Sequence, residues 1–217
     1  MSAIPRIVVL ISGRGSNLRA LLEAELEGRL GGSVVLVISN RADAAGLDIA
    51  RQFGVATEVI DHNGRERASF DADLGRAIER NACDLVVLAG FMRILTREFV
   101  QRYEARMINI HPSLLPSFGG LATHRRALDE GVRVHGCTVH FVTADLDHGP
   151  IIAQGAVPVL PDDDEARLSQ RVLAVEHRLL PAAVRAWCEG RLVIAGGRVR
   201  VLGEEALECS VEVPQLR

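Results

Sequence analysis

Short apolar runs alternate with amphipathic stretches along the first half of the chain. The apolar runs predict β-strands at residues 6–12, 33–39, 56–60, 85–89 and 107–110. The stretches between them predict helices at residues 18–26, 45–53, 67–80 and 96–103. Runs such as Ile7–Ile11 and Val34–Ile38 do not alternate in polarity, which is typical of parallel strands covered by helices on both faces. The pattern therefore predicts an α/β protein.

The second half of the chain extends this pattern. Apolar runs at residues 134–141 and 151–158 predict two further strands of the same sheet. Apolar side chains recur every three to five residues between residues 165 and 189, which predicts the longest helix. Leu192–Ala195 and Arg198–Val201 flank Gly196 and Gly197, which predicts a β-hairpin. The residues from Glu204 onward are expected to form a loose tail.

No internal repeat or Pro/Gly-rich linker divides the chain. Its 217 residues, 48% of them hydrophobic, are enough to bury one core of ordinary size. We therefore predict a single domain over residues 1–217. The expected fold is a Rossmann-like, doubly wound, mostly parallel sheet with helices on both faces and a C-terminal β-hairpin.

Composition narrows the possible partners. The 25 basic and 28 acidic residues give a net charge of −3, so no basic excess is available for binding nucleic acid. The apolar runs are too short to cross a membrane, and the N-terminal residues contain no export signal. Four widely spaced cysteines fit the reducing cytoplasm, where we expect the protein to act. Every basic residue is an arginine, which excludes reactions that need a lysine amine.

A glycine-rich turn follows the first predicted strand. In Ser12–Asn17 the glycines allow close backbone approach, and the free N–H groups of the next helix favour an anion. A dinucleotide is disfavoured because Leu18 replaces the third glycine of the usual fingerprint and no acidic residue ends the second strand. The turn therefore predicts a monophosphate site.

Polar side chains at the end of the fifth predicted strand indicate carbonyl chemistry. Asn109 and His111 point to the same side of that strand, where an amide and an imidazole together can stabilise an oxyanion and move protons. The loop 143–150 carries Asp147, whose carboxylate would favour protonated His111 if the two meet. No nucleophile elbow and no metal-binding spacing accompany them, so direct transfer without a metal is expected.

Four segments carry the most specific pattern of the sequence: Ser12–Leu18, Ala89–Leu95, Asn109–Pro116 and Leu146–Pro150. In order and spacing they resemble the phosphoribosylglycinamide formyltransferase family, and the resemblance covers about residues 6–191. It implies that the formyl group of 10-formyltetrahydrofolate moves to the amine of 5′-phosphoribosylglycinamide through a tetrahedral intermediate, a step of purine biosynthesis. Both partners implied are small molecules, with neither nucleic acid nor membrane, and the protein is expected to be a monomer or a homodimer.

The resemblance also implies roles for individual residues. The catalytic residues would be Asn109, His111 and Asp147. The residues that would hold the ribonucleotide are Gly15, Ser16 and Asn17 at its phosphate and Glu176 at its sugar or glycinamide end. Asn109 and two loops would surround the folate's pterin, and Arg67 would reach the folate tail. The loop residues are Met92, Arg93, Ile94, Leu95, Thr143, Ala144, Asp145, Leu146 and Asp147.

Two positions depart from the family pattern. Ala122 stands where the family commonly has a histidine, close to the catalytic His111. Leu173 stands where a glutamine often contacts the ribonucleotide. Both changes lower the expected activity or affinity, and neither touches the three catalytic residues.

Alternative functions remain open. Formyltetrahydrofolate hydrolase and methionyl-tRNA formyltransferase share the same Asn, His and Asp elements, but each carries a further domain for which 217 residues leave no room. A non-catalytic nucleotide-binding module would use the histidine loop only structurally, and Ala122 is compatible with it. An NAD-dependent dehydrogenase is disfavoured by Leu18.

Overall fold

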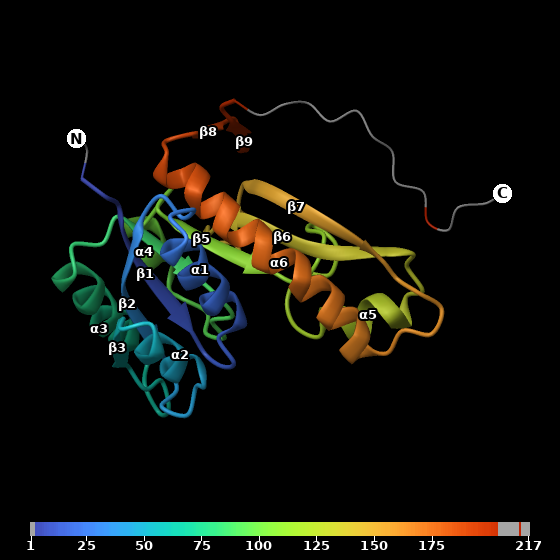
Figure 1. Cartoon of the computed structure of the whole chain (residues 1–217). Helices are drawn as coiled ribbons and strands as arrows, with labels where there is room; N and C mark the ends of the chain where they lie inside the picture. Colours follow the sequence, from blue (N-terminus) through green and yellow to red (C-terminus); the bar gives the residue numbers. More distant parts are fainter. Residues whose placement is uncertain (1–2, 204–212, 214–217) are drawn as a thin grey trace.

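The computed structural model describes residues 3–203 and residue 213, so the tail predicted from Glu204 lies almost entirely outside the described residues. Strands and helices alternate in the first half of the chain, as the sequence predicts (Figure 1). The strands are β1 (Arg6–Ile11), β2 (Ser33–Ser39), β3 (Ala56–Val59), β4 (Leu85–Leu88), β5 (Met107–His111), β6 (Val134–Phe141), β7 (Ile151–Pro158), β8 (Leu192–Ala195) and β9 (Arg198–Val201). The helices are α1 (Ser16–Leu26), α2 (Gly46–Gln52), α3 (Arg67–Arg80), α4 (Arg97–Arg102), α5 (Thr123–Asp129) and α6 (Glu165–Cys188).

Seven strands form one sheet in the order β3-β2-β1-β4-β5-β6-β7. The first five strands in this order are parallel, and β6 and β7 add two antiparallel strands at one edge. β8 and β9 form a separate hairpin. The prediction of a mostly parallel, doubly wound sheet with a C-terminal hairpin is therefore confirmed.

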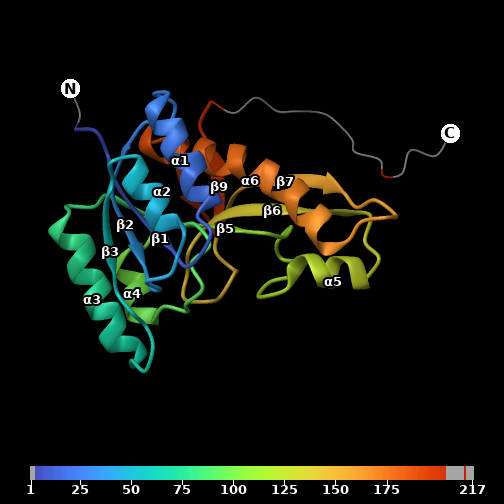
Figure 2. The ribbon, with the colours of Figure 1, turned by 60° about the horizontal axis from the view of Figure 1, so that its bottom comes forward.

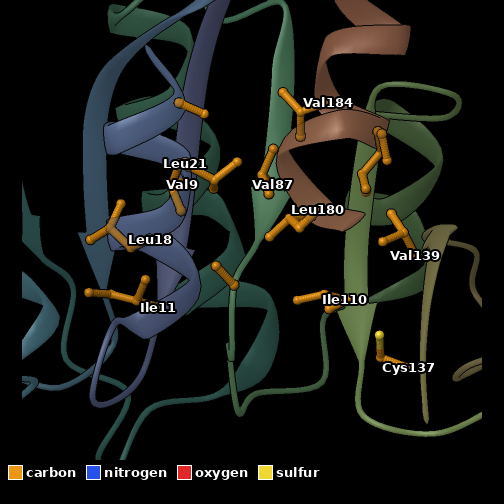
Figure 3. Close-up of a cluster of buried hydrophobic side chains, with 14 of the residues drawn as sticks. Val9, Ile11, Leu18, Leu21, Val87, Ile110, Cys137, Val139, Leu180 and Val184 are labelled. Atoms are coloured by element: carbon orange, nitrogen blue, oxygen red, sulfur yellow. The ribbon is translucent and has the colours of Figure 1, made fainter. Parts of the chain in front are cut away.

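Helices cover both faces of the sheet (Figure 2). One core cluster joins α1, α2 and α6 to side chains such as Val9 and Val87. Figure 3 shows Leu18 and Leu21 of α1 and Leu180 and Val184 of α6 in this layer, over strands that point Val9, Val87 and Val139 toward them. The second cluster packs α3 and α4 on the opposite face. Because both faces are buried, the inner strands are apolar at almost every position.

Two details differ from the sequence pattern. α1 begins at Ser16, two residues before the predicted start, because Gly15 adopts a left-handed conformation that ends the turn. α5 was not predicted: it has only seven residues, and just Thr123 and Ala127 are buried, so it shows no apolar periodicity.

α3 and α4 cover only part of their face of the sheet, and loops cover the rest. Met107 still packs into the core beneath these helices. Asn109 and His111, the next residues of β5 that face the same side, instead contact the β6 strand and the two loops at residues 112–121 and 143–149. These polar side chains are therefore covered by loops and not by the apolar core. No helix among the described residues is long and apolar enough to cross a membrane.

Candidate active site

The glycine loop brings backbone N–H groups to the start of α1. Gly15 has φ +76, and a Cβ at this residue would lie 2.5 Å from Gly46 Cα, so both conformation and space require glycine. The Gly46 N–H donates to Gly13 O at 3.0 Å and fixes the loop against α2. No side chain caps α1. Its first N–H groups are thus available to an anion, as the predicted phosphate site requires.

Glu176 of α6 lies beside this loop. Asn17 Nδ2 donates to Glu176 Oε2 at 2.6 Å, although the two residues are 159 positions apart. Burial raises the pKa of Glu176, while the Asn17 hydrogen bond and the charge of Arg14 oppose that rise. Asn17 Oδ1 is buried and has no partner among the described residues. The structure therefore brings together the residues expected to hold the ribonucleotide.

His111 is held between two oxygen acceptors at the end of β5. Its Nδ1 lies 3.6 Å from Asp147 Oδ1, and the side chains of both residues are only 9% exposed. Its Nε2 lies 3.2 Å from Phe118 O, which can only accept a hydrogen bond. The approach of Asp147 to His111 that the sequence analysis expects is present.

His140 orients Asn109 on the neighbouring strand. His140 Nδ1 lies 2.8 Å from Phe141 O and therefore carries the ring proton, so Nε2 accepts from Asn109 Nδ2 at 3.2 Å. Burial lowers the pKa of His140, which keeps the ring neutral and able to accept. The sequence pattern assigns His140 no role. Only the pairing of Asn109 with His140 across β5 and β6 identifies it.

The two loops expected to surround the pterin both expose apolar side chains. Met92, Ile94 and Leu146 are 67%, 52% and 57% exposed. The Met92 N–H donates to Ser12 Oγ at 2.7 Å, and Ser12 Oγ donates to Asn40 Oδ1 at 2.6 Å, so this loop is joined to the glycine loop. The apolar side chains expected to face the pterin are therefore accessible to a ligand.

The two arginines expected in the folate site differ in exposure and in their contacts. The Arg93 guanidinium stacks 4.5 Å from the Phe70 ring and donates to the carbonyl oxygens of His62 and Arg65. Its side chain thus anchors the loop before α3, and its place in a folate site would come from its backbone. Arg67 is exposed at the first residue of α3.

The two departures from the family pattern lie in α6 and at the start of α5. Ala122 is exposed, has φ +54 and stands at the N-cap of α5, so the position has a backbone conformation that L residues rarely adopt. Leu173 is half-buried on α6, one turn before Glu176. Among the described residues no group of three or more His, Cys, Asp or Glu side chains could hold a metal ion.

A buried histidine lies behind the active-site loop and predicts acid sensitivity. His135 is 1% exposed, and its ring packs edge-on against Phe118 and His124. Burial and the neighbouring His124 lower the pKa of His135 from 6.5 to about 4. The unfolded chain therefore takes up a proton near pH 6.5, whereas the folded chain does so only near pH 4. The destabilising effect of His135 is therefore absent above pH 6.5. It lowers the free energy of unfolding by about 3 kcal/mol as the pH falls to 4.

Urea unfolding of the wild type and of His135→Phe at pH 7 and pH 4.5 measures this contribution. We expect the wild type to lose more stability on acidification than His135→Phe, because other titrating groups contribute equally to both. His148→Phe, at an exposed histidine, should lose as much as the wild type. Equal losses in all three proteins would contradict the prediction.

Comparisons with known proteins agree with the motifs. The formyl transferase family model matches residues 5–184. The chain is 49% identical over 187 residues to the phosphoribosylglycinamide formyltransferase of Escherichia coli (strain K12), covering 86% of this chain and 88% of that protein. It is 48% identical over 208 residues to the trifunctional purine biosynthetic protein adenosine-3 of Homo sapiens, covering 95% of this chain but only a fifth of that protein's length.

A solved structure supports the same relationship. The glycinamide ribonucleotide transformylase 1 of Symbiobacterium toebii superimposes with a TM-score of 0.90 at 52% identity, covering 92% of this chain and 94% of that one. The resemblance seen in the four sequence motifs is thus confirmed by sequence and by fold. We conclude that the chain belongs to the formyl transferase family.

Proposed function

We propose that this protein transfers the formyl group of 10-formyltetrahydrofolate to the amine of 5′-phosphoribosylglycinamide in purine biosynthesis. The observation that carries the proposal is the meeting of Asn109, His111 and Asp147 at the carboxyl end of β5, the same end of the sheet at which the glycine loop follows β1. Two of the relatives described above are named for this formyl transfer, and the chain shares the fold of the Symbiobacterium toebii protein. Residues 1–217 would act as one formyltransferase domain, as a monomer or a homodimer in the cytoplasm.

The two substrates would occupy neighbouring positions at the carboxyl ends of the parallel strands. The N–H groups of Gly15, Ser16 and Asn17 would hold the phosphate, and Glu176 would contact the sugar or the glycinamide amine. The exposed apolar side chains of Met92, Ile94 and Leu146 would cover the pterin, with backbone groups of residues 93–95 and 143–147 supplying polar contacts. Arg67 would attract the acidic folate tail. Because Ser12 joins the glycine loop to Met92, the two sites are held in a fixed relation.

Direct attack suits the groups present. As the substrate amine bonds to the formyl carbon, negative charge develops on the formyl oxygen. Asn109 stabilises it by donating a hydrogen bond, and the positive charge of protonated His111 stabilises it electrostatically. The carbon–nitrogen bond to the folate then breaks, and the proton lost by the amine moves to the departing folate nitrogen. Asp147 stabilises the charge of His111 during both steps. His140 keeps the Asn109 amide turned so that Nδ2 donates.

Formyl transfer can be tested directly through the absorbance change of the folate. Turnover with 10-formyltetrahydrofolate should require 5′-phosphoribosylglycinamide, and mass spectrometry should find one formyl group on the ribonucleotide. Folate breakdown in water alone would instead indicate a hydrolase. Binding of both substrates without turnover would indicate a nucleotide-binding module and would contradict the proposal.

A further inference from the structure

The loop that holds His111 is anchored to the sheet by polar side chains that lie outside the proposed substrate contacts. Ser113 is fully buried, and its hydroxyl donates to Ser117 O at 2.7 Å. Phe118, the next residue, places its carbonyl oxygen 3.2 Å from His111 Nε2. Two residues later, the Gly120 N–H donates to Asp147 Oδ2 at 2.8 Å. The position of this loop therefore sets the position of both His111 and Asp147.

Thr138 attaches the start of this loop to β6. The side chain is fully buried, and the residue stands opposite His111 in the antiparallel register. Its hydroxyl donates to Ser113 O at 2.7 Å and accepts from the Leu115 N–H at 3.0 Å. One hydroxyl thus holds two backbone groups of the loop.

Gln154 attaches the same loop to a third strand, β7. It stands opposite Thr138 on the edge strand β7. Its Nε2 donates to Leu115 O at 2.8 Å and to Thr138 Oγ1 at 3.0 Å. The residue itself is exposed, so its side chain contributes these two hydrogen bonds and little to the core.

We propose that Gln154 is a positioning residue for His111. By holding Leu115 and Thr138 together, it keeps the loop at residues 112–120 against the sheet and Phe118 O on the imidazole. A shift of this loop would move His111 away from the formyl oxygen. Misplacing a catalytic group by about 1 Å is enough to lower the rate of an enzyme strongly. This inference rests on the proposed formyl transfer for its kinetic consequences, but not for its effect on the imidazole.

The kinetic test compares Gln154→Met, which keeps the length of the side chain and removes both hydrogen bonds, with Gln52→Met at an exposed glutamine of α2. We expect Gln154→Met to lower kcat about ten-fold with KM for the ribonucleotide changed less than two-fold. Gln52→Met should behave as the wild type. Thr138→Ser, which keeps the hydroxyl, should retain activity that Thr138→Val loses.

A double-mutant cycle separates positioning from a general structural effect. If Gln154 acts through His111, the Gln154→Met change should not reduce further the residual rate of His111→Ala. An equal ten-fold loss in both backgrounds would overturn the proposal, as would wild-type kcat in Gln154→Met.

An NMR titration of the His111 imidazole supplies a readout that needs no turnover. We expect the ring signals and their pH dependence to change in Gln154→Met and not in Gln52→Met. If the wild type proved inactive, the formyl transfer proposal would fail while this measurement still decided the role of Gln154. Unchanged His111 signals in Gln154→Met would refute the positioning role.

Discussion

His111→Ala is expected to lower kcat for formyl transfer about 10²–10³-fold, with KM for both substrates changed only slightly. The reason is that the charge of protonated His111 would stabilise an oxyanion that exists only as the amine attacks, and removing one such stabilising group typically costs that much. The imidazole is buried, but it lies between Phe118 O and Asp147 and outside the two apolar core clusters, so the truncation leaves the core intact.

Steady-state kinetics with the ribonucleotide as acceptor measures this effect. The control is the dissociation constant of the ribonucleotide, which should match the wild type because its proposed contacts lie on α1 and α6. Asn109→Ala should show a loss of similar size. Turnover of His111→Ala within three-fold of the wild type would refute a catalytic role for the imidazole.

Gly149→Ala is expected to reduce kcat/KM for 10-formyltetrahydrofolate about 10²-fold. A Cβ at Gly149 would lie 1.7 Å from Phe141 O and 3.3 Å from His140 Nδ1, so the loop at residues 143–149 must move away from the sheet. Asp147 would move with it and leave His111. Misplacement of catalytic groups on this scale accounts for the expected loss.

Gly75→Ala in α3 provides the matched control, because the nearest atom to its new Cβ is the end of the Arg102 side chain at 3.4 Å. This variant should keep wild-type kinetics. A crystal structure of Gly149→Ala should show the loop displaced from Phe141. Normal kinetics, or an unmoved loop, would contradict the explanation.

Much of the fold could be predicted because the signals are local. The non-alternating strands, the amphipathic helix at residues 165–189 and the glycine pair of the hairpin each occupy a short window of sequence. The exception is α5, where few buried side chains leave no periodicity to detect. The antiparallel direction of β6 relative to β5 also has no local signal, since it depends on the path of the chain through residues 112–133.

The sequence by itself determined the α/β class, the glycine turn, the spacing of Asn109 and His111 and the family. These features depend on residue type and on separations of a few positions, which backbone geometry converts directly into structure. Only the tertiary structure decided which distant groups meet. Glu176 reaches Asn17 across 159 residues, Asn109 pairs with His140 across 31, and Gln154 reaches Leu115 across 39. Such contacts depend on strand register and loop path, which the packing of the whole core sets.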